Sequence, residues 1–241
     1  LYTPDNLVVT FAGNITTDQS QQLAEQYFSP LAGAKGREFA PLETFGDDRV
    51  YLRTKQTEQA HLVLGVPGVS HEDEDHFAQK LLAIILGGSM SSRMFLNIRE
   101  AKGMCYYIST ETDNYLDAGS VSTRAGVDQT RLEEAIQAIQ HEYVTCASDG
   151  VTDEELNRAK EYFKGKSVLS LEDSEERAHF YGKQQLLYPK TYDLEEYFTT
   201  IDAVTKEQVD ALAKRLLVPD EMRLVVIGSA DDADKLESLL G

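Results

Sequence analysis

The chain has 241 residues, of which 41% are hydrophobic and 27% are charged, the composition of an ordinary soluble globular protein. Its formal net charge of −18 argues against a nucleic-acid backbone or an anionic membrane as the partner, because both would repel it. No apolar run approaches the roughly 20 residues that cross a bilayer. Neither Cys105 nor Cys146 belongs to a CxxC or other ligand pair, which indicates a reducing, cytoplasmic setting.

Two stretches near the ends of the chain repeat one pattern. TPDNLVVTFAGN at residues 3–14 and VPDEMRLVVIGS at residues 218–229 align so that their Pro-Asp pairs and glycines coincide. An amphipathic helical pattern follows each, so we expect a turn, a buried strand and a closing helix twice. If these elements close a folded unit, residues 1–36 are the C-terminal tail of a preceding, similar domain, and residues 46–241 form a complete one. The alternative is that two strand-helix pairs look alike by chance.

The start of the chain agrees with the first of these interpretations. The chain begins with Leu1 and has no signal-peptide pattern, so we expect it to be a piece of a longer protein. Residues 37–45 lie in a stretch rich in Pro, Gly and charge and are predicted to be the linker between the two domains.

The first half of the second domain is predicted to contain two strands and two helices. RVYLRTK and AHLVLGVPG read as strands, the second ended by Pro-Gly. Apolar residues at helical spacing then predict a helix over 75–86, which Gly87 and Gly88 end. Nearby serines offer N-cap oxygens for a second helix, SSRMFLNIREAK, which Gly103 ends.

The rest of the chain predicts a hairpin and then mainly helices. CYYISTETDNY and GSVSTRAGV are β-rich runs around a Leu-Asp-Ala-Gly turn, which predicts an antiparallel hairpin. Helical patterns follow in TRLEEAIQAIQHEYVTCA, in TDEELNRAKEYFKGKSVLSL with a capping box from Thr152 to Glu155, and over 174–187 and 205–216. Strands, a run of helices and a last strand predict an α+β fold, a mainly antiparallel sheet with helices packed on one face.

The stretch SHEDEDHF, residues 70–77, crowds two histidines among carboxylates and raises the question of a metal site. Zinc ligands on a helix stand at i and i+4, whereas His71 and His76 are five residues apart and would diverge. We therefore interpret the stretch as a solvated loop and helix N-terminus, capped by Ser70 or Asp73. The sequence predicts no metal site in this chain. The other histidines are isolated and are interpreted as structural: His61, His141 and His179.

The most informative stretch is GGSMSSRMFLNIREAKGMCYYIS, residues 87–109. Its helix and tyrosine-bearing strand resemble a segment in the C-terminal half of pitrilysin/insulinase-type zinc peptidases, closest to the bacterial and mitochondrial-processing-peptidase-like branch. YTPDNLVVTFAGN resembles the segment that closes the N-terminal domain of these enzymes, and VPDEMRLVVIGS resembles its counterpart in the C-terminal domain. The resemblance therefore covers the whole chain.

The resemblance implies paired α+β domains enclosing a chamber in which an extended peptide is cut. The zinc ligands of such enzymes, an HxxEH helix and a downstream glutamate, lie in the N-terminal domain and are absent here. Zinc is therefore expected in the complete protein and not in this chain. The C-terminal domain supplies an arginine and a tyrosine seven residues apart, which project toward the substrate backbone beside the zinc, and Arg99 and Tyr106 match them. Their N–H and O–H donors suit an oxyanion that forms during peptide hydrolysis.

The residues of this stretch also have simpler interpretations. Arg99 in a last helical turn complements the helix dipole, and Tyr106 is a common strand residue. Tyr107 is expected to point to the opposite face of its strand and pack. Cys105 is expected to be a small buried residue and not a nucleophile. The Gly-Gly pair resembles a phosphate loop only superficially, because no GxxxxGK follows.

We therefore predict the C-terminal part of a zinc-dependent metalloendopeptidase, inactive by itself. Its expected partners are the N-terminal zinc-binding domain of the same protein or a partner subunit, and a peptide substrate, but no nucleic acid and no membrane. The alternative is a non-catalytic homologue that acts as a processing-peptidase partner or scaffold subunit. A third hypothesis is an acidic module that recruits basic peptides, whose binding would fall steeply with salt.

Overall fold

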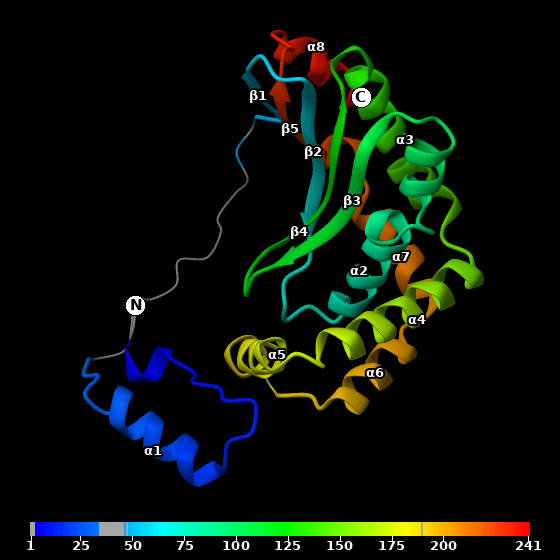
Figure 1. The fold of residues 1–241 in the computed structure, drawn as a ribbon. Helices are drawn as coiled ribbons and strands as arrows, with labels where there is room; N and C mark the ends of the chain where they lie inside the picture. The colour runs from blue at the N-terminus through cyan, green and yellow to red at the C-terminus, as the bar shows by residue number, and fades with distance from the viewer. Residues whose placement is uncertain (1–2, 34–45, 47, 189) are drawn as a thin grey trace. The chain divides into compact units, whose positions relative to one another are not determined.

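The computed structural model describes residues 3–33, 46, 48–188 and 190–241 (Figure 1). The chain forms two compact units, a smaller one of Leu1–Leu42 and Lys164–Phe198 and a larger one of Glu43–Phe163 and Thr199–Gly241. The predicted linker, residues 37–45, lies outside the described residues and stays a prediction.

The larger unit contains a sheet of five strands, in the order β1-β5-β2-β4-β3. The strands are β1 (Val50–Thr54), β2 (Gln59–Gly68), β3 (Cys105–Asn114), β4 (Gly119–Asp128) and β5 (Arg223–Gly228). β1 and β5 are parallel, and the other neighbouring pairs are antiparallel. β3 and β4 form the predicted hairpin, in whose turn the Tyr115 amide donates to the Ala118 carbonyl at 2.8 Å.

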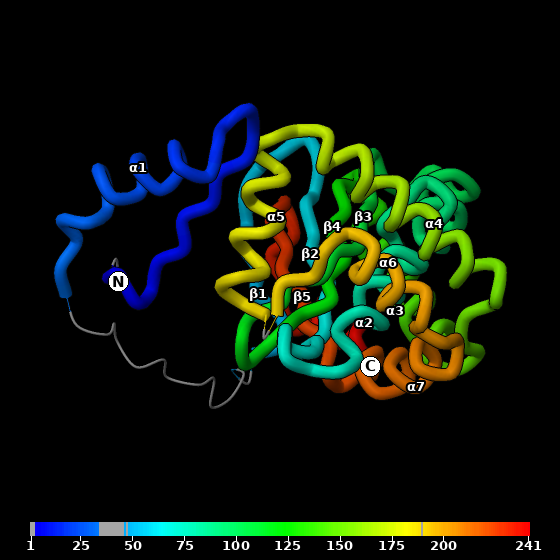
Figure 2. Tube along the Cα trace, turned by 90° about the horizontal axis from the view of Figure 1, so that it is seen from below, coloured from blue at the N-terminus to red at the C-terminus, as the bar shows by residue number. Residues whose placement is uncertain are grey.

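Helices cover one face of this sheet. The helices in the larger unit, or extending into it, are α2 (His76–Ala83), α3 (Leu132–Asp149), α4 (Asp153–Ser170), α6 (Leu194–Ala203), α7 (Lys206–Leu216) and α8 (Ala233–Ser238). α2, α3 and α7 contact the sheet, and α3 and α7 lie next to each other, as Figure 2 shows from a second direction. No helix in the described part of this unit covers the opposite face, from Tyr51 on β1 to Tyr107 on β3, which we call the open face. The predicted α+β class is confirmed.

Alternation along the strands explains the two faces. On β2, Ala60, Leu62 and Leu64 are fully buried, whereas the residues between them are only partly covered. A period of two is the pattern of a sheet with one buried and one solvated face. The core therefore lies between the sheet and the helices.

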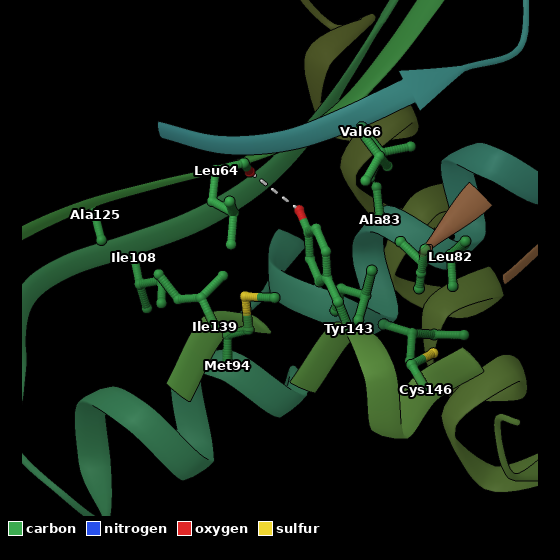
Figure 3. Packing of buried hydrophobic residues seen from close by; sticks show 14 of the residues in the cluster. Leu64, Val66, Leu82, Ala83, Met94, Ile108, Ala125, Ile139, Tyr143 and Cys146 are labelled. Carbon is green, nitrogen blue, oxygen red and sulfur yellow. Dashed lines mark hydrogen bonds between the residues drawn. The ribbon is translucent and has the colours of Figure 1, made fainter. Parts of the chain in front are cut away.

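Tyr143 carries a polar group into the centre of this core (Figure 3). Its hydroxyl donates to the carbonyl of Leu64 at 3.3 Å and lies 2.9 Å from the hydroxyl of Thr123, which in turn lies 2.8 Å from that of Thr110. Burial raises the pKa of the Tyr143 phenol well above its usual value. The chain of hydroxyls satisfies polar atoms that would otherwise destabilise the core.

The Gly-Gly pair ends the helical segment that contains α2, because a π-helix at Ile84–Gly88 continues α2 up to Gly88. Gly87 packs against β3, where an added Cβ would lie 2.7 Å from the backbone nitrogen of Thr110 and closer still to its hydroxyl oxygen. A close approach between helix and strand therefore explains this glycine.

We expect the Gly87→Ala variant to lose about 1 to 3 kcal/mol of unfolding free energy, the cost of overpacking a rigid site. Gly165→Ala is the matched control, since a Cβ at Gly165 of α4 would meet nothing within 4 Å. The control should be stabilised by about 0.5 to 1 kcal/mol, because alanine replaces glycine within a helix. Urea denaturation measures both, and equal stability of the two variants would contradict the close packing of Gly87.

The smaller unit contains a 3-10 turn (Pro4–Asn6), α1 (Thr17–Phe28) and α5 (Ser174–Leu187). The segment between the turn and α1 runs along α5, with the Thr10 hydroxyl donating to the carbonyl of Ala178 at 3.0 Å. At Gly182 an added Cβ would lie 3.0 Å from the Thr10 hydroxyl oxygen. The small residue Gly182 of α5 therefore lets the side chain of Thr10 approach closely.

The repeat is only partly confirmed. Its second copy forms a 3-10 turn (Pro219–Glu221), β5 and α8, whereas residues 7–12 of the first copy form no strand within the described part of the chain. A strand exists only when a neighbouring strand completes its hydrogen bonds. α1, moreover, has no buried residue.

Candidate functional site

A helix-to-strand turn fixes the chain between Arg99 and Tyr106. A π-helix at Phe95–Glu100 carries Arg99, and Gly103 follows it at φ +57°, in the left-handed region that favours glycine. The Gly103 amide donates to the Arg99 carbonyl, and the Met104 amide donates to the Ile98 carbonyl, both at 3.1 Å. The bond from Gly103 to Arg99 is the αL motif that often ends a helix at a glycine with positive φ, and the second bond joins Met104 and Ile98, whose side chains are both buried.

Arg99 is exposed, and its guanidinium carbon lies 4.8 Å from the centre of the Phe95 ring. Burial raises the pKa of the Cys105 thiol, and the positive charge of Arg99 partly offsets that rise. A buried thiol with a raised pKa is a poor nucleophile, which agrees with the interpretation of Cys105 as a packing residue.

β3 contains a bulge at Tyr106. Cys105 pairs with Val127 and Tyr107 pairs with Gly126, so Tyr106 is an extra residue with no partner in the ladder. The exposed fractions of Tyr106 and Tyr107 are 58% and 43%. The prediction that Tyr107 packs on the opposite face is wrong, because strict alternation holds only for a regular strand. Bulges of this kind re-aim side chains and are common beside active sites.

Tyr107 reaches across β4 to His61 on β2. Its hydroxyl lies 3.0 Å from the Nδ1 atom of His61, and the two rings are stacked with their centroids 6.2 Å apart. Gly126 lies between them and leaves room for the tyrosine ring. The prediction that His61 is isolated is therefore wrong. The contact depends on Gly126 pairing with Tyr107 on one side and with His61 on the other. The sequence could have predicted it only if the strand register had been known.

SHEDEDHF forms the predicted loop and helix N-terminus, with Glu72 and Glu74 exposed, but the prediction that its histidines are solvated is wrong. His71 and His76 have exposed fractions of 5% and 2%, and their ring centroids lie 4.9 Å apart. Their side chains come together because His71 precedes the helix, where helical rotation does not apply. Neither predicted cap forms, since Asp75 is the N-cap residue without a side-chain bond, while Asp73 accepts from the Asp75 amide at 2.8 Å. Among the residues that the structure describes, no three or more His, Cys, Asp or Glu side chains gather in a way that could hold a metal ion.

Arg93 anchors the start of the helical segment that bears Arg99. Its Nε and Nη2 atoms donate to the two carboxylate oxygens of Glu155 at 2.6 and 2.8 Å, and Nη2 also donates to the Gly150 carbonyl at 2.8 Å. Glu155 accepts from the Thr152 amide at 2.8 Å, and its own amide donates to the Thr152 hydroxyl, which confirms the predicted capping box. Burial disfavours the Glu155 carboxylate, but its hydrogen bonds to Arg93 and Thr152 outweigh that effect and lower its pKa to about 2.

Comparisons with known proteins agree on the family. Residues 1–163 match the family described as the peptidase M16 inactive domain. The chain is 36% identical over 219 residues to the uncharacterized zinc protease YmxG of Bacillus subtilis, covering 91% of this chain and 53% of that protein. It is 34% identical over 221 residues to an uncharacterized zinc protease of Mycobacterium leprae, covering 90% of this chain and 49% of that protein. The chain thus spans about half the length of the curated relatives it matches.

Solved structures show the same fold. A peptidase M16 inactive domain from Pseudomonas fluorescens superposes with a TM-score of 0.77 at 22% identity, covering 91% of this chain and 53% of that one. A chain of complex III2 from Candida albicans superposes with a TM-score of 0.76 at 17% identity, covering 95% of this chain and 57% of that one. None of the helices in the described ranges is both long and apolar enough to cross a membrane. The chain belongs to the peptidase M16 family, in which it matches the inactive domain.

Proposed function

We propose that this chain is the C-terminal part of a zinc-dependent metalloendopeptidase that cuts peptides in an enclosed chamber. In this proposal Arg99 and Tyr106 act on the substrate, and the zinc ligands lie in another part of the complete protein. The observation that carries the proposal is that a glycine-capped turn and a bulge leave both side chains exposed, at the two ends of one short helix-to-strand connection.

The chemistry assigned to the two residues is donation to oxygen. The Tyr106 O–H and the Arg99 N–H groups donate to the peptide carbonyl oxygen on which negative charge develops, and to the neighbouring main chain. Both belong to ordered elements, so little rearrangement is needed during the reaction. Zinc does not fit among the described residues of this chain, because no group of ligands gathers there.

The proposed partner is the N-terminal zinc-binding domain, in the same protein or in a separate subunit. Residues 1–36 are then the tail of that domain, and residues 46–241 are the complete second domain. Two findings support this division: the chain covers about half of its curated relatives, and residues 7–12 form no strand among the described residues. We place the protein in the cytoplasm and in the processing-peptidase-like branch of the family.

The test compares this chain with the complete protein from which it comes. The chain alone should bind no stoichiometric zinc and hydrolyse no peptide, because in this proposal the zinc ligands lie in another part of the complete protein. The complete protein should bind zinc and hydrolyse a fluorogenic peptide, and a chelator should abolish that hydrolysis. Metal analysis and a peptide assay measure both properties.

Two outcomes would change the assignment. Zinc binding or hydrolysis by this chain alone would contradict the proposal. A complete protein with neither zinc nor hydrolysis would instead support the non-catalytic homologue, a scaffold or presenting subunit.

A further inference from the structure

We propose that His61 and Tyr107 form a subsite on the open face that receives a carboxylate of the bound peptide. This inference rests on the proposed function for the presence of a peptide at this face. It concerns which peptides the protein prefers, a property that Arg99 and Tyr106 do not determine.

The subsite lies in one row of residues that crosses the whole sheet. The strand register aligns Tyr107 with Gly126, Gly126 with His61, His61 with Ile227, and Ile227 with Arg53. The polar side chains of this row are those of Tyr107, His61 and Arg53, each of which can donate a hydrogen bond, and none is a carboxylate. A ligand that meets this row therefore encounters hydrogen-bond donors and positive charge.

Gly126 makes the pair possible. Neighbouring strands lie about 4.8 Å apart, so Tyr107 and His61 stand two strand spacings from each other. The tyrosine ring crosses this gap because Gly126 has no side chain, and an added Cβ would lie 2.9 Å from the Cδ1 atom of Tyr107. The result is an ordered pair of exposed side chains on the solvated side of the sheet, away from the core. A binding group held in place before the ligand arrives costs less entropy on binding.

The pair presents a donor to solvent in either tautomer. If the Tyr107 hydroxyl donates to Nδ1, the His61 proton is on Nε2 and available to a ligand. If Nδ1 donates instead, the Tyr107 O–H is available. A carboxylate oxygen accepts a hydrogen bond more strongly than a neutral carbonyl does, and Arg53 adds a positive charge to the same row, so the chemistry favours a carboxylate.

Two carboxylates on the neighbouring strands are bonded to other groups and not to the His61–Tyr107 pair. Glu111 of β3 is bonded to Arg124 of β4 at 2.7 Å. Asp128, also on β4, accepts from the amide and hydroxyl of Thr130 at 2.8 and 2.5 Å. Arg53 on β1 is exposed in the same row as the pair. These two carboxylates thus have partners of their own, and Arg53 adds a positive charge to the row that would attract an incoming anion.

The test uses the complete protein with its zinc removed, so that peptides bind without being cut. Pairs of peptides differ by Glu or Gln at a single position, which is moved along the sequence around the scissile bond. Calorimetry at pH 7 gives the affinity of each peptide. At one position, Glu should bind about tenfold more tightly than Gln, since one charge-assisted hydrogen bond is worth about 1.4 kcal/mol more than a neutral one.

Variants separate the subsite from a general effect on the fold. Tyr107→Phe keeps the ring over Gly126 and removes the hydroxyl, and His61→Gln removes the imidazole that bonds to this hydroxyl. Each variant should reduce the tenfold preference to near unity. Tyr115→Phe is the matched control, because it removes a hydroxyl from a tyrosine that is 64% exposed at the tip of the hairpin. Its preference should equal that of the wild type.

The outcomes distinguish this inference from the proposed function. Equal binding of Glu and Gln peptides at every position, no binding of either, or a preference that survives both variants would overturn the inference. Hydrolysis by the zinc-loaded protein in those cases would leave the proposed function standing. A Glu preference that the variants abolish, in a protein that hydrolyses nothing, would support the subsite and overturn the enzyme assignment.

Discussion

Tyr106→Phe in the complete protein should lower kcat for peptide hydrolysis by about 10² to 10³-fold, the cost of removing one oxyanion donor. The substitution removes only the hydroxyl, and the bulge that exposes Tyr106 is a backbone feature that phenylalanine can keep. KM should change little, because the lost bond forms with the charge that develops in the transition state. Steady-state kinetics and metal analysis of the purified variant measure the result.

Arg99→Ala should lower kcat by a similar factor. Arg99→Lys should retain only part of the wild-type kcat, because lysine lacks the forked donors of arginine. Zinc content should equal that of the wild type in all these variants, since no described residue of this chain gathers with others as a metal ligand. Tyr51→Phe is the control, a tyrosine that is 66% exposed on β1 at the opposite edge of the same sheet. Zinc loss in the Tyr106 or Arg99 variants, or unchanged turnover, would refute the roles assigned to them.

Arg93→Ala should lower the free energy of unfolding by about 3 kcal/mol, because it leaves the Glu155 carboxylate without its partner in a largely buried place. The two side chains are only 15% and 21% exposed. Arg124→Ala is the control, since it breaks the exposed Arg124–Glu111 pair, whose side chains are 47% and 53% exposed, and should cost at most about 1 kcal/mol. Urea denaturation at pH 7 measures both variants, and an equal loss in the two would contradict the special role of Arg93.

The same pair gives stability a pH dependence. The pKa of Glu155 is lowered from 4.5 to about 2 in the folded state, so the unfolded chain binds the proton more readily than the folded one. The contribution is complete above the unfolded value, near pH 4.5, and is lost as the pH falls toward 2. It amounts to about 2 kcal/mol after allowance for solvent screening. Glu155→Gln should lack this part of the acid sensitivity, so its stability curve between pH 5 and 3 should be flatter than that of the wild type.

Loss of the Arg93 side chain should also lower catalytic activity, because it should displace the segment that carries Arg99. Arg93 lies two residues before the π-helix that carries Arg99, and through Glu155 and Gly150 it holds that segment against the turn between α3 and α4. Glu155→Gln keeps a hydrogen-bonding group and should disturb the segment less than Arg93→Ala. A catalytic defect in the arginine variant measured well below its unfolding transition would report this positioning effect.

The sequence by itself determined most of the elements, because their signals are local. Alternating apolar residues predicted the strands and hairpin, Gly103 predicted the end of its helix, and Thr152 with Glu155 predicted the start of α4. The resemblance in residues 87–109 correctly identified the family. Each of these signals depends on neighbours within a few positions along the chain, so no knowledge of long-range contacts was needed.

The tertiary structure decided which side chains meet. The bulge at Tyr106 changed the facing of Tyr107, and only the register between β2, β4 and β3 brought that residue to His61. The pairing of Arg93 with Glu155, 62 positions further along the chain, left no sequence signal that we recognised. The strand expected in residues 7–12 is absent from the described structure, although its counterpart β5 forms between two neighbours. A local sequence pattern favours extended backbone. Hydrogen bonds to a neighbouring strand are needed to make that segment a strand, and they determine which residues lie beside it.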